Sequence, residues 1–379
     1  MHWIALRMLT GDVVKYVGMV FGVAFSTLLI AQQSSIFLGL VERAASTVRD
    51  VRDADLWVMD PRIEAVDNVW PMPETVLQRV RGVDGVAWAA PFLRATTTIV
   101  AADLPLQTAS LIGLDDATLA GLPPDIVAGN RADLAAPGTV MMDEGGWRFL
   151  FGDAPFQPGR EIELNDRRAV VVGLVRAGAQ FSAQVALYAR YSTAVTYAPG
   201  GRNRLTFVIA RAADGYAPAA VAAAIQAETG LKALDAPAFA RASSDYVIFN
   251  TGIPISFGTV VFLGVLVGIV IVALTFTLFI RDNLRQFASL KAIGVSNPRL
   301  VGMVLLQGAV VGAIGYAIGL GGATWIVHAG AANALALRGF FVPPGVALFA
   351  ALIVAVIIAV SGLIAILKVL ATDPAEVFR

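Results

Sequence analysis

The sequence predicts an α-helical membrane protein with four transmembrane helices and a large mixed α/β extracytoplasmic domain between helices 1 and 2. Three observations lead to this fold class. The 379 residues are 57% hydrophobic and only 15% charged, whereas soluble proteins carry about 25% charged residues. Four segments are each apolar over the roughly 20 residues that a helix needs to cross a bilayer. A long segment of ordinary polarity separates the first of them from the second.

The four apolar segments are Val17–Leu40, Ile255–Ile280, Leu300–Val327 and Val346–Leu367. The first is longer than the apolar core of a signal peptide, which has about 7–15 residues, so we expect a retained anchor. Pro343-Pro344 marks the start of the last helix. The predicted parts are therefore 1–41 (N-terminus and helix 1), 42–250 (outer domain with stalk ends), 251–280 (helix 2), 281–299 (coupling loop), 300–327 (helix 3), 328–343 (outer loop) and 344–379 (helix 4 and tail).

Basic residues at the span ends predict the orientation, because cytoplasmic loops are enriched in Lys and Arg. The segment 281–299 carries four basic residues against Asp282 alone, and the loop 328–343 carries only Arg338. Further basic residues lie at the N-terminal side and after the last span: Arg7, Lys15 and Lys368. Both termini and the segment 281–299 are therefore predicted to be cytoplasmic, with 42–250 on the opposite side.

The outer segment has the pattern of a mixed α/β domain. Helical stretches are expected at Pro73–Val80 and Tyr216–Thr229, and 42–54 and 236–250 are expected to continue spans one and two outward as a stalk. Runs rich in Val, Ile, Thr and aromatic residues, most of them flanked by turn residues, predict strands. They are Asp55–Met59, Val86–Ala90, Thr96–Val100, Ala169–Val175, Val185–Tyr188 and Leu205–Ala210.

Composition excludes most catalytic chemistry. The chain has no cysteine and two histidines, neither of them in the outer domain, so thiol catalysis and a multi-histidine metal site are not expected. No phosphate-binding loop of the form G-x-x-x-x-G-K-[S/T] occurs. The net charge is zero, which gives no general attraction to nucleic acid. The cores of the spans carry no charge, which argues against an ion-coupled carrier.

Some polar and aromatic residues allow two interpretations each. Gln32, Gln33, Ser34 and Ser35 either mark the start of the stalk or line a path for substrate. The pairs Asp115-Asp116 and Asp143-Glu144 are adjacent carboxylates, and neighbours in sequence need not share a pocket. Four tryptophans of the outer segment belong either to its core or to a partner contact: Trp57, Trp70, Trp88 and Trp147.

The segment 281–299 is the most informative part of the chain. Leu284, Phe287 and Leu290 recur every three residues and predict one apolar stripe on a short helix. Gly294 is placed to end that helix in a left-handed conformation. Ser296-Asn297-Pro298 then reads as the cap and first turn of span three. A positive rim comes from Arg281, Arg285 and Lys291. The segment is either a lever for a cytoplasmic partner or an ordinary interfacial helix whose charges only set orientation.

Small residues four apart recur in the spans and allow helix backbones to approach closely. Each pair serves either packing within one chain or contact with a second copy. The pairs are Gly18/Gly22, Gly264/Gly268, Gly308/Gly312 and Gly315/Gly319.

Leu290-Lys-Ala-Ile-Gly294 after a charged helix, the tail Ala371–Arg379 and the order of one span, outer domain and three spans resemble the permeases of the MacB/FtsX-type ABC transporters. Pro73–Pro91 is similar to the start of that family's outer domain. Length and loop sequence are nearest the DevC-like subgroup. Gln286 departs from the pattern, because many members have an acidic residue there and its salt bridge to the ATPase would be absent.

The resemblance implies a homodimeric or heterodimeric permease of the bacterial inner membrane that binds no cofactor itself. ATP and Mg would bind to a cytoplasmic ATPase dimer that docks on residues 281–299, in a mechanotransmission cycle. The implied partners are a second permease copy, a periplasmic membrane-fusion adaptor, an outer-membrane duct as in tripartite efflux, and membrane lipid as cargo. Signal transmission to a cell-wall hydrolase, as in FtsX-like members, and lipoprotein extraction are the alternatives. We expect Leu290→Asp or Phe287→Asp to uncouple ATP hydrolysis without unfolding the protein.

Overall fold

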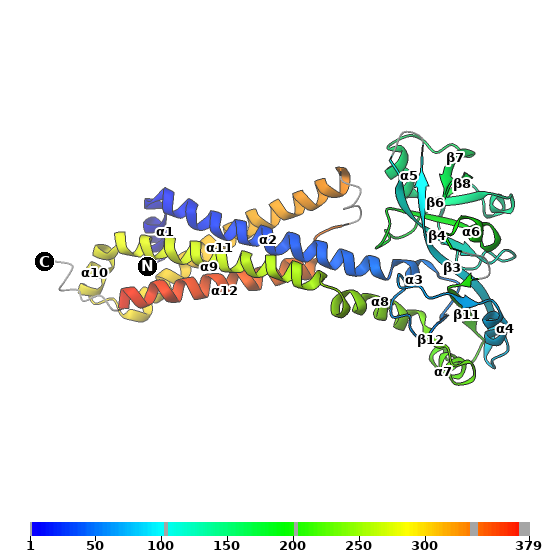
Figure 1. The fold of residues 1–379 in the computed structure, drawn as a ribbon. Helices are drawn as coiled ribbons and strands as arrows, with labels where there is room; N and C mark the ends of the chain where they lie inside the picture. The colour runs from blue at the N-terminus through cyan, green and yellow to red at the C-terminus, as the bar shows by residue number, and fades with distance from the viewer. Residues whose placement is uncertain (1, 102–104, 201–203, 334–339, 371–379) are drawn as a thin grey trace. The chain divides into compact units, whose positions relative to one another are not determined.

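The computed structural model describes residues 2–101, 105–200, 204–333 and 340–370 (Figure 1). The chain forms two compact units. Residues 1–38 and 252–379 make up the first, called here the transmembrane unit, and residues 39–251 make up the α/β domain. Arg338 and the tail 371–379, which the sequence interpretation used, lie outside the described residues.

The transmembrane unit contains four helices that are long and apolar enough to cross a membrane. With the intervening α/β domain they confirm the predicted fold class. The last of them begins at Pro344, as the double proline predicts. The helices are α2 (Val13–Ala44), α9 (Ile253–Asp282), α11 (Asn297–Asn333) and α12 (Pro344–Leu370), and two shorter ones join them, α1 (His2–Gly11) and α10 (Leu284–Ala292).

Glycine allows α2 and α9 to pack closely. A Cβ atom at Gly22 would lie 2.6 Å from Ile271 Cγ2, and one at Gly268 would lie 2.3 Å from Ser26 Oγ. Ser26 Oγ also donates a hydrogen bond of 2.9 Å to the carbonyl oxygen of Gly264. The small residues at these positions therefore bring two backbones together within one chain, as interhelical packing in a bilayer requires.

The frame of the α/β domain is a β-α-β-β-α-β arrangement with antiparallel strands in the order β12-β1-β11-β3. Helices α4 and α7 pack on one face of this sheet over an aliphatic cluster that includes Val80, Val208 and Ile225. The elements are β1 (Leu56–Met59), α4 (Thr75–Arg81), β3 (Val86–Val100), β11 (Phe207–Ala212), α7 (Pro218–Thr229) and β12 (Lys232–Asp235).

The long segment between β3 and β11 adds a closed ring of strands. The second half of β3 pairs with β4 and β7, and the pairs β4–β9, β9–β6, β6–β8 and β8–β7 complete the ring. One buried cluster, with Leu111, Val171 and Leu187, fills it. Its further elements are β4 (Gln107–Leu114), β5 (Ile126–Ala128), η1 (Arg131–Ala135), β6 (Thr139–Asp143), α5 (Glu144–Phe151), β7 (Arg160–Leu164), β8 (Arg167–Val175), β9 (Val185–Arg190) and α6 (Tyr191–Tyr197).

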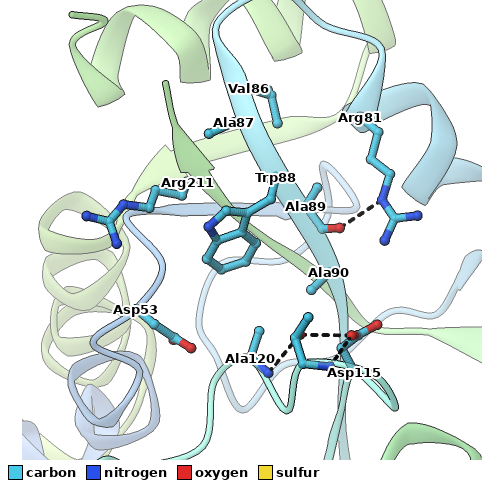
Figure 2. A pocket seen from close by; sticks show the side chains of 11 residues that line it. Asp53, Arg81, Val86, Ala87, Trp88, Ala89, Ala90, Asp115, Ala120 and Arg211 are labelled. Carbon is cyan, nitrogen blue, oxygen red and sulfur yellow. Dashed lines mark hydrogen bonds between the residues drawn. The ribbon is translucent and has the colours of Figure 1, made fainter. Parts of the chain in front are cut away.

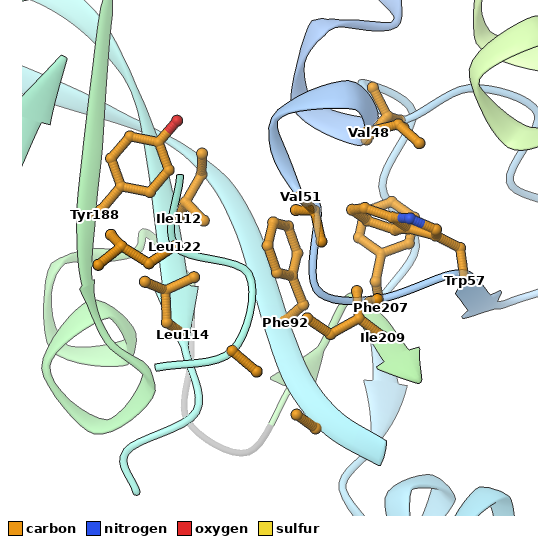
Figure 3. Packing of buried hydrophobic residues seen from close by; sticks show 14 of the residues in the cluster. Val48, Val51, Trp57, Phe92, Ile112, Leu114, Leu122, Tyr188, Phe207 and Ile209 are labelled. Atoms are coloured by element: carbon orange, nitrogen blue, oxygen red, sulfur yellow. The ribbon is translucent and has the colours of Figure 1, made fainter. Parts of the chain in front are cut away.

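An aromatic cluster joins the frame to the ring. The Trp57 ring centroid lies 5.1 Å from that of Phe92 and 5.5 Å from that of Phe207, both in edge-on geometry. Figure 3 shows that the cluster continues past Phe92 on β3 to Ile112 and Tyr188 of the ring. Because β3 belongs to both sheets, this shared core makes the domain one packed body.

Two of the strands predicted from sequence are one strand in the structure. The prediction ended Val86–Ala90 before Pro91, but β3 continues to Val100. Pro91 lies opposite Val208 in the sheet, where proline has no N–H to donate. The neighbouring backbone is held instead by Thr206, whose Oγ1 accepts from Arg94 N at 2.7 Å and donates to Phe92 O at 2.9 Å.

The predicted stalk segments are largely helical. Helix α2 runs on to Ala44 and α3 (Ser46–Asp50) follows, while α8 (Ala236–Asn250) matches the predicted return segment 236–250. Asp235 caps α8 by accepting a hydrogen bond of 2.7 Å from Ala238 N. One short pair, β2 (Met72–Pro73) with β10 (Arg204–Leu205), completes the described elements.

Candidate functional site

Helix α10 has the boundaries that the sequence predicts. It begins at Leu284, and Asn283 Nδ2 donates to the carbonyl oxygen of Phe279 at 2.8 Å. Gly294 follows its last turn with φ of +98°. Gly294 N donates to Lys291 O and Val295 N donates to Leu290 O, both at 3.0 Å. These two bonds form a Schellman motif, which fixes the sharp exit from α10 toward α11.

Two residues of the predicted apolar stripe of α10, Phe287 and Leu290, pack against the bundle. Phe287 is only 2% exposed and belongs to the buried cluster of the transmembrane unit. Leu290 packs against the same cluster, and Leu284 is half-buried. These contacts give Phe287 and Leu290 an anchoring role within the chain, and the docking role expected of the segment stays a prediction. A charge at Phe287 would be buried without a partner and would destabilise the bundle, contrary to the expectation that Phe287→Asp leaves the fold intact.

The exposed face of α10 combines positive charge with one apolar side chain. Arg281 and Arg285 are exposed, Lys291 is half-buried, and Ile293 is 82% exposed just before Gly294. Lys15, which also contributed to the predicted orientation, forms ion pairs with Asp12 and with Asp282 of α9. The positive rim therefore consists of the side chains on and around α10.

The predicted packing glycines of α11 are in contact within the chain. A Cβ atom at Gly312 would lie 2.0 Å from Ile358 Cδ1, and Gly308 faces the same side chain of α12. Gly315 lies against Val23 of α2, and a Cβ at Gly319 would lie 2.3 Å from the carbonyl oxygen of Ala24. Both pairs therefore hold α11 to its own neighbours within the chain.

A buried polar network ties the stalk helix α3 to the strands of the α/β domain. Its centre is Arg94, which is 3% exposed and forms an ion pair of 2.5 Å with Asp67. The guanidinium also lies 3.5 Å from Thr47 Oγ1 of α3 and 3.4 Å from Gln180 Oε1 of the β8–β9 loop. Thr47 Oγ1 in turn donates to Gln180 Oε1 at 2.6 Å. Displacement of α3 therefore acts directly on β3 and on the ring.

A second contact of α3 is made by Asp50, whose carboxylate accepts from Gly178 N at 3.0 and 3.1 Å. Burial raises the pKa of the Asp50 carboxyl to about 6, because the charged form loses hydration there. The Gly178 hydrogen bond and the charge of Arg52 act in the opposite direction, and Asp143 adds to the rise.

The raised pKa of Asp50 predicts a pH-dependent stability. Between about pH 4 and pH 6 the folded protein binds more protons than the unfolded chain, so stability falls as pH rises through this range. Asp50→Asn keeps an acceptor for Gly178 N and removes the titration. We expect it to stabilise the protein at pH 7.5 by up to about 3 kcal/mol and to change little at pH 4. Thermal unfolding of the full chain at both values measures this; a lower melting temperature of the variant at pH 7.5 would contradict it.

The adjacent carboxylates have structural roles. Asp143 caps α5 by accepting from Gly146 N at 2.9 Å and also accepts from Ala186 N at 2.7 Å. Asp115 accepts from Thr118 N at 2.9 Å within its own turn, and Asp116 accepts from Ser192 N at 3.1 Å. These four hydrogen bonds give Asp115, Asp116 and Asp143 structural roles in turns, a helix cap and a strand.

A cleft of about 680 Å³ opens on the frame of the α/β domain. Figure 2 shows the Trp88 indole at its centre, with Arg211 and Asp53 on one side and Arg81 and Asp115 on the other. Arg81 Nε is held by a hydrogen bond of 2.8 Å to Ala89 O. An aromatic face between charges of both signs suits a polypeptide partner.

The structure separates the four tryptophans that the sequence left undecided. Trp57 and Trp147 are buried core residues. Trp88 is half-buried in the cleft, and Trp70 is exposed with the Arg62 guanidinium 4.2 Å from its ring centroid. Trp70 and Trp88 are therefore the two available for a partner.

Sequence reasoning missed Ile293 and the Arg94 network. Ile293 stood inside the Leu290–Gly294 motif, but it falls outside the three-residue period that drew attention to the stripe. The members of the network are far apart in sequence, so only the folded strands bring them together.

Two family models match the chain. The model of the MacB-like periplasmic core domain matches residues 16–228, and the model of the FtsX-like permease C-terminal region matches residues 258–374. The first match covers more than half of the chain. Together with the four apolar helices, these matches indicate a multi-pass protein of the inner membrane.

Solved structures of related domains also match. The periplasmic region of MacB from Actinobacillus actinomycetemcomitans has 15% identity and a TM-score of 0.38, covering 54% of this chain and 96% of that one. The extracellular domain of the noncanonic ABC-type transporter YknZ from Gram-positive bacteria has 16% identity and a TM-score of 0.36, covering 48% and 98%. A search of the curated proteins found no match. On the strength of the two family models, the chain belongs to the MacB/FtsX-type family of ABC transporter permeases.

Proposed function

We propose that this permease couples ATP hydrolysis by a separate cytoplasmic ATPase dimer to movement of its α/β domain, and that it exports a lipid-like or amphiphilic cargo. The observation that carries the proposal is the construction of α10. Buried Phe287 anchors the helix to the bundle, while Ile293 and the basic rim project from it. A partner that binds the exposed face would therefore move the bundle along with the helix.

The order of the helices along the chain provides a route by which movement of α10 would reach the α/β domain. Helix α10 directly joins α9 to α11, and α9 follows α8 in the chain. Helix α8 is fixed in the α/β domain by buried Phe239 and by Ser243, whose Oγ accepts a hydrogen bond of 3.1 Å from Val66 N. A tilt of α9 would thus be passed to α8, and a tilt of α2 to α3 and the Arg94 network.

The proposal places both termini and the segment 281–299 in the cytoplasm, because the basic residues gather there. ATP and Mg would bind to the partner ATPase, since the sequence has no phosphate-binding loop. A second permease copy would complete the complex and present a second α10 to the ATPase dimer.

The cleft around Trp88, with Trp70 as a second exposed aromatic, is the surface that we assign to a periplasmic membrane-fusion adaptor. Aromatic and arginine side chains are enriched in the energetic centres of protein interfaces. An adaptor and an outer-membrane duct would carry the cargo onward, as in the DevC-like subgroup. A cell-wall hydrolase bound at this cleft instead would indicate transmembrane signalling.

The test is ATP hydrolysis in proteoliposomes that contain the permease and a candidate ABC ATPase subunit from the same organism. We expect the permease to recruit the ATPase to the membrane and to change its hydrolysis rate severalfold. An ATPase that neither binds these liposomes nor changes its rate would contradict the proposed coupling.

A further inference from the structure

A groove of about 350 Å³ lies in the transmembrane unit, at the ends of the spans that lead into the α/β domain. Pro254 and Gly345, each the second residue of its helix, lie at one end of it. Three helices contribute to its walls. The lining includes Gln33, Ser34 and Phe37 of α2, Phe257, Gly258 and Val261 of α9, and Val346 and Phe349 of α12.

The walls are aromatic and open to the side. The rings of Phe37 and Phe257 lie 5.9 Å apart, centroid to centroid. Leu38, Gly258 and Phe349 are exposed at the surface of the bundle. The groove is therefore continuous with the apolar surface of the spans, which faces lipid in a membrane. Its natural neighbours are acyl chains.

Polar groups are present at one level of this apolar groove. In the described part of the chain, neither the Gln33 amide nor the Ser34 hydroxyl has a hydrogen-bond partner. Nearby hydroxyls of the same helix are satisfied: Ser35 Oγ donates to Ala31 O at 2.7 Å and Thr27 Oγ1 to Val23 O at 2.8 Å. An amide next to hydrocarbon without a partner is unfavourable. A ligand with a carbonyl group would relieve this.

The position of Gln33 along the span is consistent with a ligand that carries a carbonyl group. Gln33 lies one turn along α2 from Phe37, about 6 Å closer to the middle of the span. Gln33 and Phe37 are thus both within reach of a lipid whose ester carbonyls lie at the boundary of the hydrocarbon layer. The Phe37 ring, which lies farther from the middle of the span than Gln33, and the Phe257 ring beside it would contact the glycerol region of that lipid.

We propose that this groove binds the glycerol ester region of one bilayer phospholipid, with the Gln33 amide donating to an ester carbonyl and the acyl chain continuing from there toward the middle of the span. That the bound lipid is cargo rests on the proposed export function. Lipid tails are as apolar as the groove itself, so the transfer gains little hydrophobic free energy. Retention then depends on close packing against the rings and on the amide hydrogen bond.

Glycine positions allow a sharp test. A Cβ atom at Gly258 would meet nothing within 4 Å, so Gly258→Trp fills the groove without a clash of its first atom. Gly302 of α11 is also exposed, has nothing within 4 Å of an added Cβ and does not line the groove, so Gly302→Trp is the matched control. Gly345→Leu, also at an open position, fills the groove from another helix.

The measurement is native mass spectrometry of the full chain released from phosphatidylglycerol nanodiscs into mild detergent. We expect one phospholipid retained per wild-type chain and per Gly302→Trp chain, and at least tenfold lower occupancy for Gly258→Trp and Gly345→Leu. Gln33→Leu, which keeps the groove apolar, should lower occupancy about threefold, as expected for one hydrogen bond in a bilayer.

Equal retention by all variants would overturn the proposal. A dimer that dissociates in Gly258→Trp while lipid retention stays unchanged would also overturn it and would identify the groove as a contact between copies. The ATPase is absent from this measurement. Normal lipid retention without stimulated hydrolysis would therefore refute only the coupling function, and stimulated hydrolysis without retention would refute only the lipid site.

Discussion

Ile293→Asp is expected to abolish stable binding of the partner ATPase. Ile293 is the most exposed apolar side chain of the α10 segment, beside the positive rim. We assign Ile293 to the centre of the docking face, where loss of a hot-spot residue costs about 2 kcal/mol or more, so the affinity should fall by about 30-fold or more. The fold should be unaffected, because the side chain packs against nothing that an aspartate would leave empty.

Ile255→Asp is the matched control. It makes the same change at a residue that is 73% exposed, at the opposite end of α9. Binding is measured by sedimentation of the ATPase with proteoliposomes that carry each variant. Retained binding in Ile293→Asp, or equal loss in both variants, would remove α10 from the docking surface. Leu290→Ala tests the anchoring role. It should lower the melting temperature of the permease more than it lowers ATPase binding in the sedimentation assay.

Arg94→Met is expected to give the largest loss of stability in the α/β domain. Breaking a buried ion pair from one side costs about 3–5 kcal/mol when the remaining charge is uncompensated. We expect the lower end of this range, because Asp67 is 22% exposed and keeps a hydrogen bond of 2.8 Å from Ser182 Oγ. Here Asp67 would remain, and Gln180 and Thr47 would lose a shared donor. For a domain of this size the melting temperature should fall on the order of 10 °C.

Tryptophan fluorescence of the full chain follows this unfolding, because Trp57 lies in the core of the same domain. The double variant Arg94→Met with Asp67→Asn should recover part of the loss, since no buried charge then remains unpaired. A melting temperature of Arg94→Met within 2 °C of the wild type corresponds to a loss of under about 1 kcal/mol. That result would show that the ion pair does not stabilise the contact of α3 with the strands.

The transmembrane unit could be predicted well because its physical signals are local. Uncharged runs longer than 20 residues, the double proline before α12 and Gly294 after α10 each act through their own backbone. The strands β1, β8 and β9 were also found, since valine, leucine and aromatic residues concentrate in them. Missed strands such as β7 are short and carry many charges, as at Glu161 and Glu163, so the alternation of the two apolar residues of β7, Ile162 and Leu164, is a weak signal.

The candidate site was harder to predict, because the role of each residue depends on which part of the structure it contacts. A three-residue apolar period on α10 shows that one face is buried, but it does not tell whether the cover is the bundle or a partner; Phe287 faces the bundle. The same ambiguity applied to Gly308 and Gly312, which contact Ile358 of the same chain. The Arg94 network is beyond local reasoning, since Thr47 and Gln180 meet only after the strands have paired.

The central claim is that energy enters at α10 on one side of the membrane and leaves through the α/β domain on the other. Because the chain has no cysteine, two single-cysteine variants can locate both parts: Ser289→Cys on the exposed face of α10 and Gln226→Cys on the exposed face of α7. The measurement is labelling of spheroplasts by a membrane-impermeant maleimide. Gln226→Cys should react in intact spheroplasts and Ser289→Cys only after permeabilisation; reaction of both in intact spheroplasts would contradict the account.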